Sequence, residues 1–173
     1  MPTGLIHRIG IAAPAETIYH ALTTEDGIRA WWTTDVTIGE CVGDTAVFGF
    51  FNRETVFEMR IEELILNGQS DANSPSTVLR TPSPPAGQKE GMRERSLVRW
   101  KCIGGTSPDW VGTTQEFILE PQPDGEVLLK FCHGGWERGG DHCYYCSNTT
   151  RGGHLLVCLK DYAEREVKNP YFR

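Results

Sequence analysis

The sequence predicts an α+β fold in which a bent antiparallel sheet of seven strands surrounds a long C-terminal helix. Three observations lead to this prediction. Strand-like alternation of apolar and polar residues begins near the N-terminus, it returns in a series of segments between residues 45 and 133, and helical spacing appears only at the two ends of that series. One long helix cannot fill the concave side of such a sheet completely. We therefore expect an internal apolar cavity.

The N-terminal part predicts one strand followed by two short helices. Residues 5 to 11 alternate between apolar and polar side chains, which is typical of a half-buried strand. After Pro14, a residue suited to a first helical turn, apolar side chains recur at helical spacing as far as Leu22. Thr24 can then cap a second helix that ends near Trp31.

The middle of the chain predicts a meander of antiparallel strands, and its end predicts a helix. The alternating segments are residues 45–51, 56–62, 97–103, 113–120 and 127–133. Residues 122–125 (QPDG) have the composition of a tight turn and would join the last two strands in a hairpin. Apolar residues then recur at helical spacing from Leu155 to Val167. We expect a helix of residues 148–168, which Asn169 and Pro170 would terminate.

The apolar residues of the predicted strands fall on one sheet face, so they are candidate ligand-binding residues in the expected cavity. Taken singly, each is better explained as ordinary core packing, but together they suit an apolar or aromatic ligand. The candidates are Phe48, Phe50, Phe57, Met59, Trp100, Phe117, Leu119, Leu129 and Phe131. Three further aromatic residues at predicted loop or helix ends are expected to plug the mouth of the sheet, although such positions also suit ligand gating or a protein contact: Trp32, Trp110 and Trp136.

Two polar residues, Gln115 and His133, also fall on the inward face. If Leu119 faces Leu129 in the predicted hairpin, then Gln115 faces His133, and the two can form a hydrogen bond. As a functional pair they would anchor a ligand carbonyl or hydroxyl, or His133 would act as a general acid or base. A histidine that is simply satisfied at the cavity rim is the better-supported interpretation.

The six cysteines are expected to be free thiols in a reducing compartment. Cys143 and Cys146 form a CxxC motif, with His142 and the Cys132–His133 dipeptide nearby in sequence, which would supply enough donors for zinc. The dipeptide lies on a strand and points its two side chains to opposite faces. We therefore expect inert thiols rather than a metal site or a redox pair, and we expect no cofactor.

Residues 68–95 interrupt the pattern of the single domain that we expect over residues 1–173. The segment contains four of the ten prolines and no hydrophobic period. It is either a functional lid or an insertion tolerated at a strand connection, and we favour a flexible insertion. A genuine insertion and an unspliced intron are both consistent with the sequence.

Bulk properties exclude several classes of function. The formal charge of −6 and the absence of a basic stripe argue against a nucleic-acid partner. Neither a signal-like leader nor an apolar run of about 20 residues is present, so we expect a cytoplasmic protein that does not enter a membrane. Motifs for phosphate loops, dinucleotides, zinc peptidases and serine hydrolases are absent from the sequence.

Several stretches resemble the SRPBCC superfamily, in its branch of homologues of the heat-shock chaperone ATPase activator (AHSA-like). They are IGIAAPAETIYHALTTEDGIRAWW, FEMRIEEL, VRWKCIGGTSPDWVGTTQEFILEP and FCHGGW, and the resemblance covers nearly the whole chain apart from residues 68–95. It implies a START-like helix-grip fold with a hydrophobic pocket. It implies less about activity, because this fold serves lipid carriers, hormone receptors, cyclases and chaperone cofactors alike.

Three functions from different classes follow. The first is a noncatalytic domain that binds a small hydrophobic molecule in its cavity. The second is an enzyme of the cyclase or hydrolase kind that uses His133 with Gln115, which requires a titrating inward histidine. The third is a chaperone-associated interaction module with an unknown protein partner, which the family suggests but a single domain supports poorly.

Overall fold

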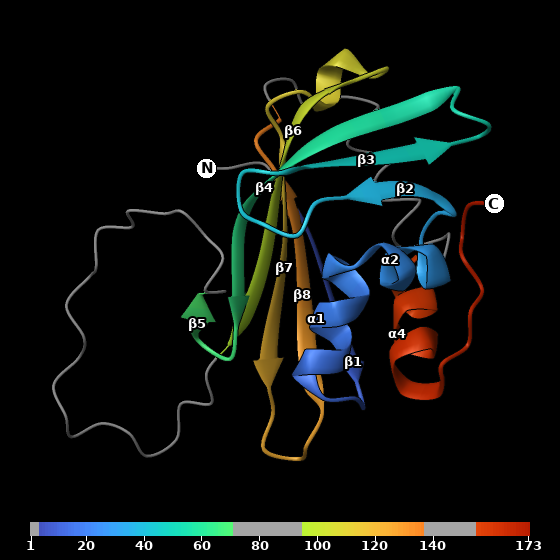
Figure 1. Ribbon diagram of the computed structural model, residues 1–173. Coiled ribbons are helices and arrows are strands. Elements are labelled where there is room, and N and C mark those ends of the chain that lie inside the picture. Colours follow the sequence, from blue (N-terminus) through green and yellow to red (C-terminus); the bar gives the residue numbers. More distant parts are fainter. Residues whose placement is uncertain (1–3, 71–94, 137–154) are drawn as a thin grey trace, which may run out of the picture.

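The computed structural model describes residues 4–70, 95–136 and 155–173, and an antiparallel sheet with helices on one side dominates it (Figure 1). The sheet has the strand order β1-β8-β7-β6-β4-β3-β2, and the short β5 pairs with β4 outside this path. The predicted seven-stranded antiparallel sheet is confirmed. The elements are β1 (Leu5–Ile11), α1 (Ala15–Thr23), α2 (Glu25–Trp31), β2 (Asp35–Ile38), β3 (Thr45–Phe50), β4 (Thr55–Leu66), β5 (Gln69–Ser70), β6 (Ser96–Gly105), the 3-10 helix η1 (Pro108–Trp110), β7 (Thr114–Pro121), β8 (Val127–Gly134) and α4 (Leu155–Arg165).

The two predicted short helices are confirmed, and Thr24 separates them. Its hydroxyl accepts a hydrogen bond from the Gly27 backbone N–H at 3.1 Å, which satisfies one free donor at the start of α2. The turn is tight at Gly27. A Cβ there would lie 2.6 Å from the carbonyl oxygen of His20, so only glycine fits where α2 passes the end of α1.

Helix α4 ends earlier than the apolar periodicity predicts. Glu166 adopts a left-handed conformation (φ 56°), and its N–H donates to the carbonyl of Tyr162 at 2.8 Å, which is a helix-capping geometry. Val167 therefore lies beyond the helix and is 44% exposed. A side-chain hydrogen bond also connects α4 to the end of β1: Lys160 Nζ donates to the Gly10 carbonyl at 2.6 Å.

Two irregularities bend the central strands. In the pairing of β4 with β6, the register shifts once between Glu58 and Met59 and again between Ile61 and Glu63. The second shift leaves Glu62 as an extra residue, so that Leu64 rather than Glu63 is buried in the core. Glu63 instead forms an ion pair with Arg99 on β6.

The core lies between the concave sheet face and the helices. Trp32, directly after α2, is central to it, with ring centroids 4.9 Å from Phe48, 5.4 Å from Trp31 and 6.1 Å from Trp100. Trp100 is completely buried, and its ring also packs edge-to-face on Phe117 of β7. Aromatic side chains thus connect α2 to β3, β6 and β7.

The predicted insertion begins later than residue 68. Asn67 and Gly68 both have positive φ (49° and 73°) and form the two-residue turn of a hairpin between β4 and β5. The N–H of Gly68 donates to the carbonyl of Arg95 at 3.1 Å, so the two ends of the segment meet. The remainder of the predicted insertion, residues 71–94, lies outside the described residues.

Replacing residues 71–94 by a short Gly-Ser linker should leave the domain folded. The linker has little distance to span, and a shorter loop costs less closure entropy, so we expect the melting temperature to stay unchanged or to rise by about 2–5 °C. Thermal unfolding followed by circular dichroism measures this. A variant with residues 71–94 in scrambled order is the control for length, and loss of cooperative unfolding in both variants would show that the segment packs against the core.

Candidate functional site

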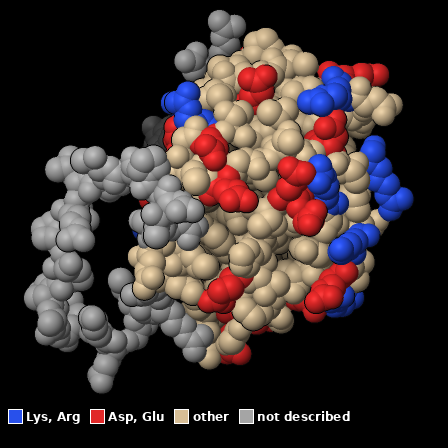
Figure 2. All heavy atoms as spheres, viewed as in Figure 1, with Lys and Arg blue, Asp and Glu red and all other residues tan. Residues whose placement is uncertain are grey.

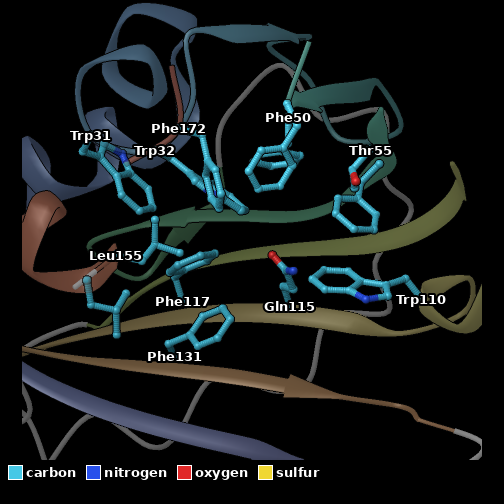
Figure 3. A pocket seen from close by; sticks show the side chains of 13 residues that line it. Trp31, Trp32, Phe50, Thr55, Trp110, Gln115, Phe117, Phe131, Leu155 and Phe172 are labelled. Atoms are coloured by element: carbon cyan, nitrogen blue, oxygen red, sulfur yellow. The ribbon is translucent and has the colours of Figure 1, made fainter. Parts of the chain in front are cut away.

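A cavity of about 140 Å³ lies between the sheet and the helices (Figure 3). Its described wall residues are aromatic and aliphatic except for Thr55 and Gln115. The three tryptophans of the wall also carry an indole N–H each, and that of Trp31 donates to the carbonyl of Ala21. The lining residues are Trp31, Trp32, Phe50, Phe51, Thr55, Phe57, Trp110, Gln115, Phe117, Phe131, Leu155, Leu156 and Phe172.

Five of the eleven residues predicted to bind a ligand line this cavity. They are Phe50, Phe57, Gln115, Phe117 and Phe131, all on the concave face of the sheet as the alternation predicted. Phe48 and Met59 line a neighbouring gap that has no room for a water molecule. Trp100, Leu119 and Leu129 are completely buried in the core around the cavity and do not line it.

Sequence periodicity missed most of the wall that comes from outside the sheet. Trp32 and Trp110 were expected at the mouth, and both line the cavity. Leu155 and Leu156 begin α4, so helical spacing could have assigned them. Phe51 and Phe172 belong to no periodic pattern, and no local signal in the sequence identifies them.

The C-terminal segment closes one side of the cavity. Backbone N–H groups of Tyr171 and Phe172 donate to the carbonyls of Trp31 and Trp32, at 3.0 and 2.8 Å. These bonds place the Phe172 ring edge-to-face against Phe50, with centroids 4.8 Å apart. In Figure 1 the red C-terminal segment accordingly runs past α4 to the level of β2.

The turn between β3 and β4 supplies the other side of this contact. Phe51, Asn52 and Arg53 all have positive φ, between 52° and 66°, which is uncommon for residues other than glycine. The Phe51 ring lies 5.4 Å from that of Phe172 and is 59% exposed, so this end of the cavity wall meets solvent.

Gln115 and His133 are direct cross-strand partners, which confirms the register predicted for the β7–β8 hairpin. His133 does not line the cavity. It is completely buried, and its Nε2 lies 3.0 Å from the hydroxyl of Thr113. That hydroxyl donates to the carbonyl of Trp110 at 2.7 Å, so it accepts from His133, whose Nε2 carries the proton.

Burial keeps His133 uncharged. The imidazole packs against the rings of Trp110 and Trp136, with centroids 4.7 and 4.5 Å away. Removal from water disfavours the charged form and lowers the pKa of His133 from 6.5 to about 3. A histidine in this state is a structural hydrogen-bond donor at neutral pH rather than a proton-transfer group.

Gln115 carries an unpaired polar group in the core, as does Trp100, whose indole nitrogen is also buried without a partner. Gln115 is 2% exposed, and its Oε1 is buried without any hydrogen-bond partner. Figure 3 shows its carboxamide between Phe117 and Trp110, pointing from the sheet toward the side chains of α2 and the C-terminal segment. An unpaired buried acceptor costs about 1–3 kcal/mol.

Among the described residues, the cavity wall contains none of the His, Cys, Asp and Glu side chains that could bind a metal ion. None of the described side chains in the cavity wall is titratable. Among residues 4–70, 95–136 and 155–173, no three His, Cys, Asp or Glu side chains gather as metal ligands. Cys41, Cys102, Cys132 and Cys158 carry free thiols, whereas the CxxC pair of Cys143 and Cys146 lies outside the described residues.

The outer surface carries charges of both signs. On the face seen in Figure 2, Asp and Glu are interspersed with Lys and Arg, and no continuous basic area forms. Several of these charges are paired across the sheet, as are Lys130 and Glu120 at 2.7 Å. No helix in the part of the chain that the structure describes has the length and apolarity needed to cross a membrane.

Comparison with known proteins places this fold. No protein-family model and no curated protein sequence matches the chain. Among solved structures, the Aha1 dimer from Colwellia psychrerythraea is 28% identical, with a TM-score of 0.67 over 94% of this chain and 97% of that one.

Two more distant structures show the same fold. The major latex-like protein 151 from Panax ginseng is 10% identical, with a TM-score of 0.58 over 94% of this chain and 97% of that one. Norcoclaurine synthase from Thalictrum flavum, solved with dopamine and hydroxybenzaldehyde, is 11% identical, with a TM-score of 0.55 over 93% and 86% of the two chains. The predicted helix-grip architecture is thereby confirmed.

The buried state of His133 predicts a dependence of stability on pH. Between pH 6.5 and about 3 the unfolded chain binds a proton on His133 that the folded chain does not, so stability falls as the pH falls through this window. We expect His133→Gln to remove this contribution, which amounts to at most about 1.4 kcal/mol per pH unit.

Urea denaturation of both proteins from pH 7.5 downward measures the effect. The difference between their free energies of unfolding should be constant above pH 6.5 and should change steadily below it. A difference that is the same at every pH would contradict a buried neutral histidine.

Proposed function

This chain belongs to the AHSA-like branch of the SRPBCC superfamily, and we propose that it binds a small apolar or aromatic molecule in the cavity between the sheet and α4. The observation that carries the proposal is the cavity wall. It is aromatic and aliphatic on nearly every side, and its described residues include no group that must stay hydrated.

Cavity energetics support the proposal. Side chains that line an empty apolar space have no contact partner on that side and lose those dispersion contacts. An apolar ligand restores the missing dispersion contacts and leaves water at the same time. Binding and stabilisation of the fold are then linked, and the ligand raises the melting temperature.

An enzyme that uses His133 with Gln115 has less support. Catalysis by His133 requires an imidazole that reaches the ligand and titrates near neutral pH. Burial behind Trp110 and a pKa of about 3 oppose both requirements. The likeness to norcoclaurine synthase is one of fold alone, since only 11% of residues are identical.

A chaperone-associated role draws only on the likeness to Aha1. The two chains match over nearly their full lengths, which is compatible with a shared partner. No surface feature of the described residues specifies what that partner would be. We therefore keep the small-molecule proposal as the function that the geometry supports best.

Extraction of the purified native protein, followed by mass spectrometry of small molecules, tests the proposal directly. We expect an apolar or aromatic compound in a fixed ratio to protein. A protein that copurifies with none and gives no rise in melting temperature with any apolar aromatic compound would contradict the proposal.

Leu156→Phe should narrow the cavity and weaken binding. Leu156 lines the cavity from α4, so a larger side chain there occupies ligand space and costs about 1–3 kcal/mol of stability through overpacking. We expect at least a tenfold loss of affinity for an apolar fluorescent probe, measured by fluorescence titration. Leu159→Phe is the matched control, because Leu159 is buried on the same helix but does not line the cavity. Equal losses of affinity in the two variants would contradict binding in this cavity.

A further inference from the structure

We propose that the ligand of this cavity is a neutral phenol, a single aromatic ring whose hydroxyl group donates a hydrogen bond to Oε1 of Gln115. The inference rests on the proposed binding function and names the chemical class that the cavity selects. Three properties of the cavity carry it: its size, the lack of charge in its wall, and the unsatisfied acceptor of Gln115.

The size of the cavity selects a single ring. An engineered cavity of about 150 Å³ lined by Leu, Ile and Phe holds one benzene molecule. The cavity of about 140 Å³ described above is of the same size and is bounded on most sides by rings. Phe57 stacks on Trp110 at 4.1 Å, and Phe117 packs against Phe131 at 4.9 Å, so the wall offers ring faces and edges that favour an aromatic ligand.

The wall also selects a neutral ligand. Its described residues are aromatic and aliphatic side chains together with Thr55 and Gln115, and none of them carries a charge. A carboxylate or ammonium group would lose its hydration without gaining an ion pair, which costs far more than an apolar contact returns. Benzoate-like and amine-like rings of the same size are therefore disfavoured.

Gln115 selects a hydrogen-bond donor. Its Oε1 is a buried acceptor without a partner, at the inward face of β7 and two residues before Phe117. The terminal amide torsion of glutamine is soft, so the oxygen can turn toward a ligand at little cost. A phenolic hydroxyl then satisfies the acceptor, and the free energy that the unpaired oxygen costs in the empty protein adds to the affinity.

The discriminating ligands are p-cresol and toluene, which differ only by the hydroxyl group. We expect isothermal titration calorimetry to give a lower dissociation constant for p-cresol than for toluene with the wild-type protein. Gln115→Met keeps the length of the side chain and removes its polar atoms, and we expect it to shift the ratio of the two dissociation constants toward toluene by about tenfold. Gln122→Met is the matched control, because it makes the same exchange in the turn between β7 and β8, outside the cavity wall, and it should leave the ratio unchanged.

The outcomes separate the two proposals. If neither compound binds the wild-type protein, the proposed function fails. If both bind but Gln115→Met leaves the ratio unchanged, or Gln122→Met shifts it by as much, the cavity binds ligands but the phenol inference is wrong.

A second measurement covers the case in which Gln115→Met does not fold. In the wild-type protein, NMR should show the side-chain amide of Gln115 shifting with p-cresol well beyond its shift with toluene. Equal shifts with both compounds would overturn the inference.

Discussion

The packing of Trp32 is the contact on which the other features of the molecule depend. Its ring lies against Phe48, Phe50 and Trp100 of the sheet, while its backbone carbonyl accepts the N–H of Phe172. One residue thus fixes the distance between α2 and the sheet and also anchors the C-terminal segment. Trp32 also lines the cavity, so the ring that joins the two layers forms part of the cavity wall.

The two inward polar residues of the β7–β8 hairpin differ in their hydrogen bonding: the His133 ring has a partner, whereas Oε1 of Gln115 has none. His133 donates a hydrogen bond to the hydroxyl of Thr113, and that hydroxyl donates one to the backbone carbonyl of Trp110. Gln115, the cross-strand partner of His133, keeps a bare oxygen beside the cavity. The first arrangement stabilises η1 and the strands around it. The second lowers stability in the empty protein, because it leaves a buried acceptor without a partner.

Much of the sheet could be predicted from the sequence, because alternation in 97–103, 113–120 and 127–133 directly records which side chains face inward. The hairpin register followed from the same alternation and gave the pairing of Gln115 with His133. The cavity wall was predicted only in part. Periodicity distinguishes inward-facing from outward-facing side chains, but it cannot distinguish an inward side chain packed in the core from one that lines the cavity. For this reason the sequence predicts the same role for Trp100, Leu129 and Phe117, although only Phe117 lines the cavity. Phe172 reaches the cavity through long-range backbone bonds that leave no local pattern.

The pairing of β1 with β8 also constrains when the domain can assemble. Leu5 lies opposite His133, and Ile11 lies opposite Val127, so the first strand of the domain finds its partner only after most of the domain has been synthesised. Until then, one edge of the growing sheet and the apolar face of β1 remain uncovered. Contacts that join such distant parts of a chain slow folding, because the loop between them must close first. The nascent chain therefore presents its apolar N-terminal strand to its surroundings for longer than a domain built from local contacts would.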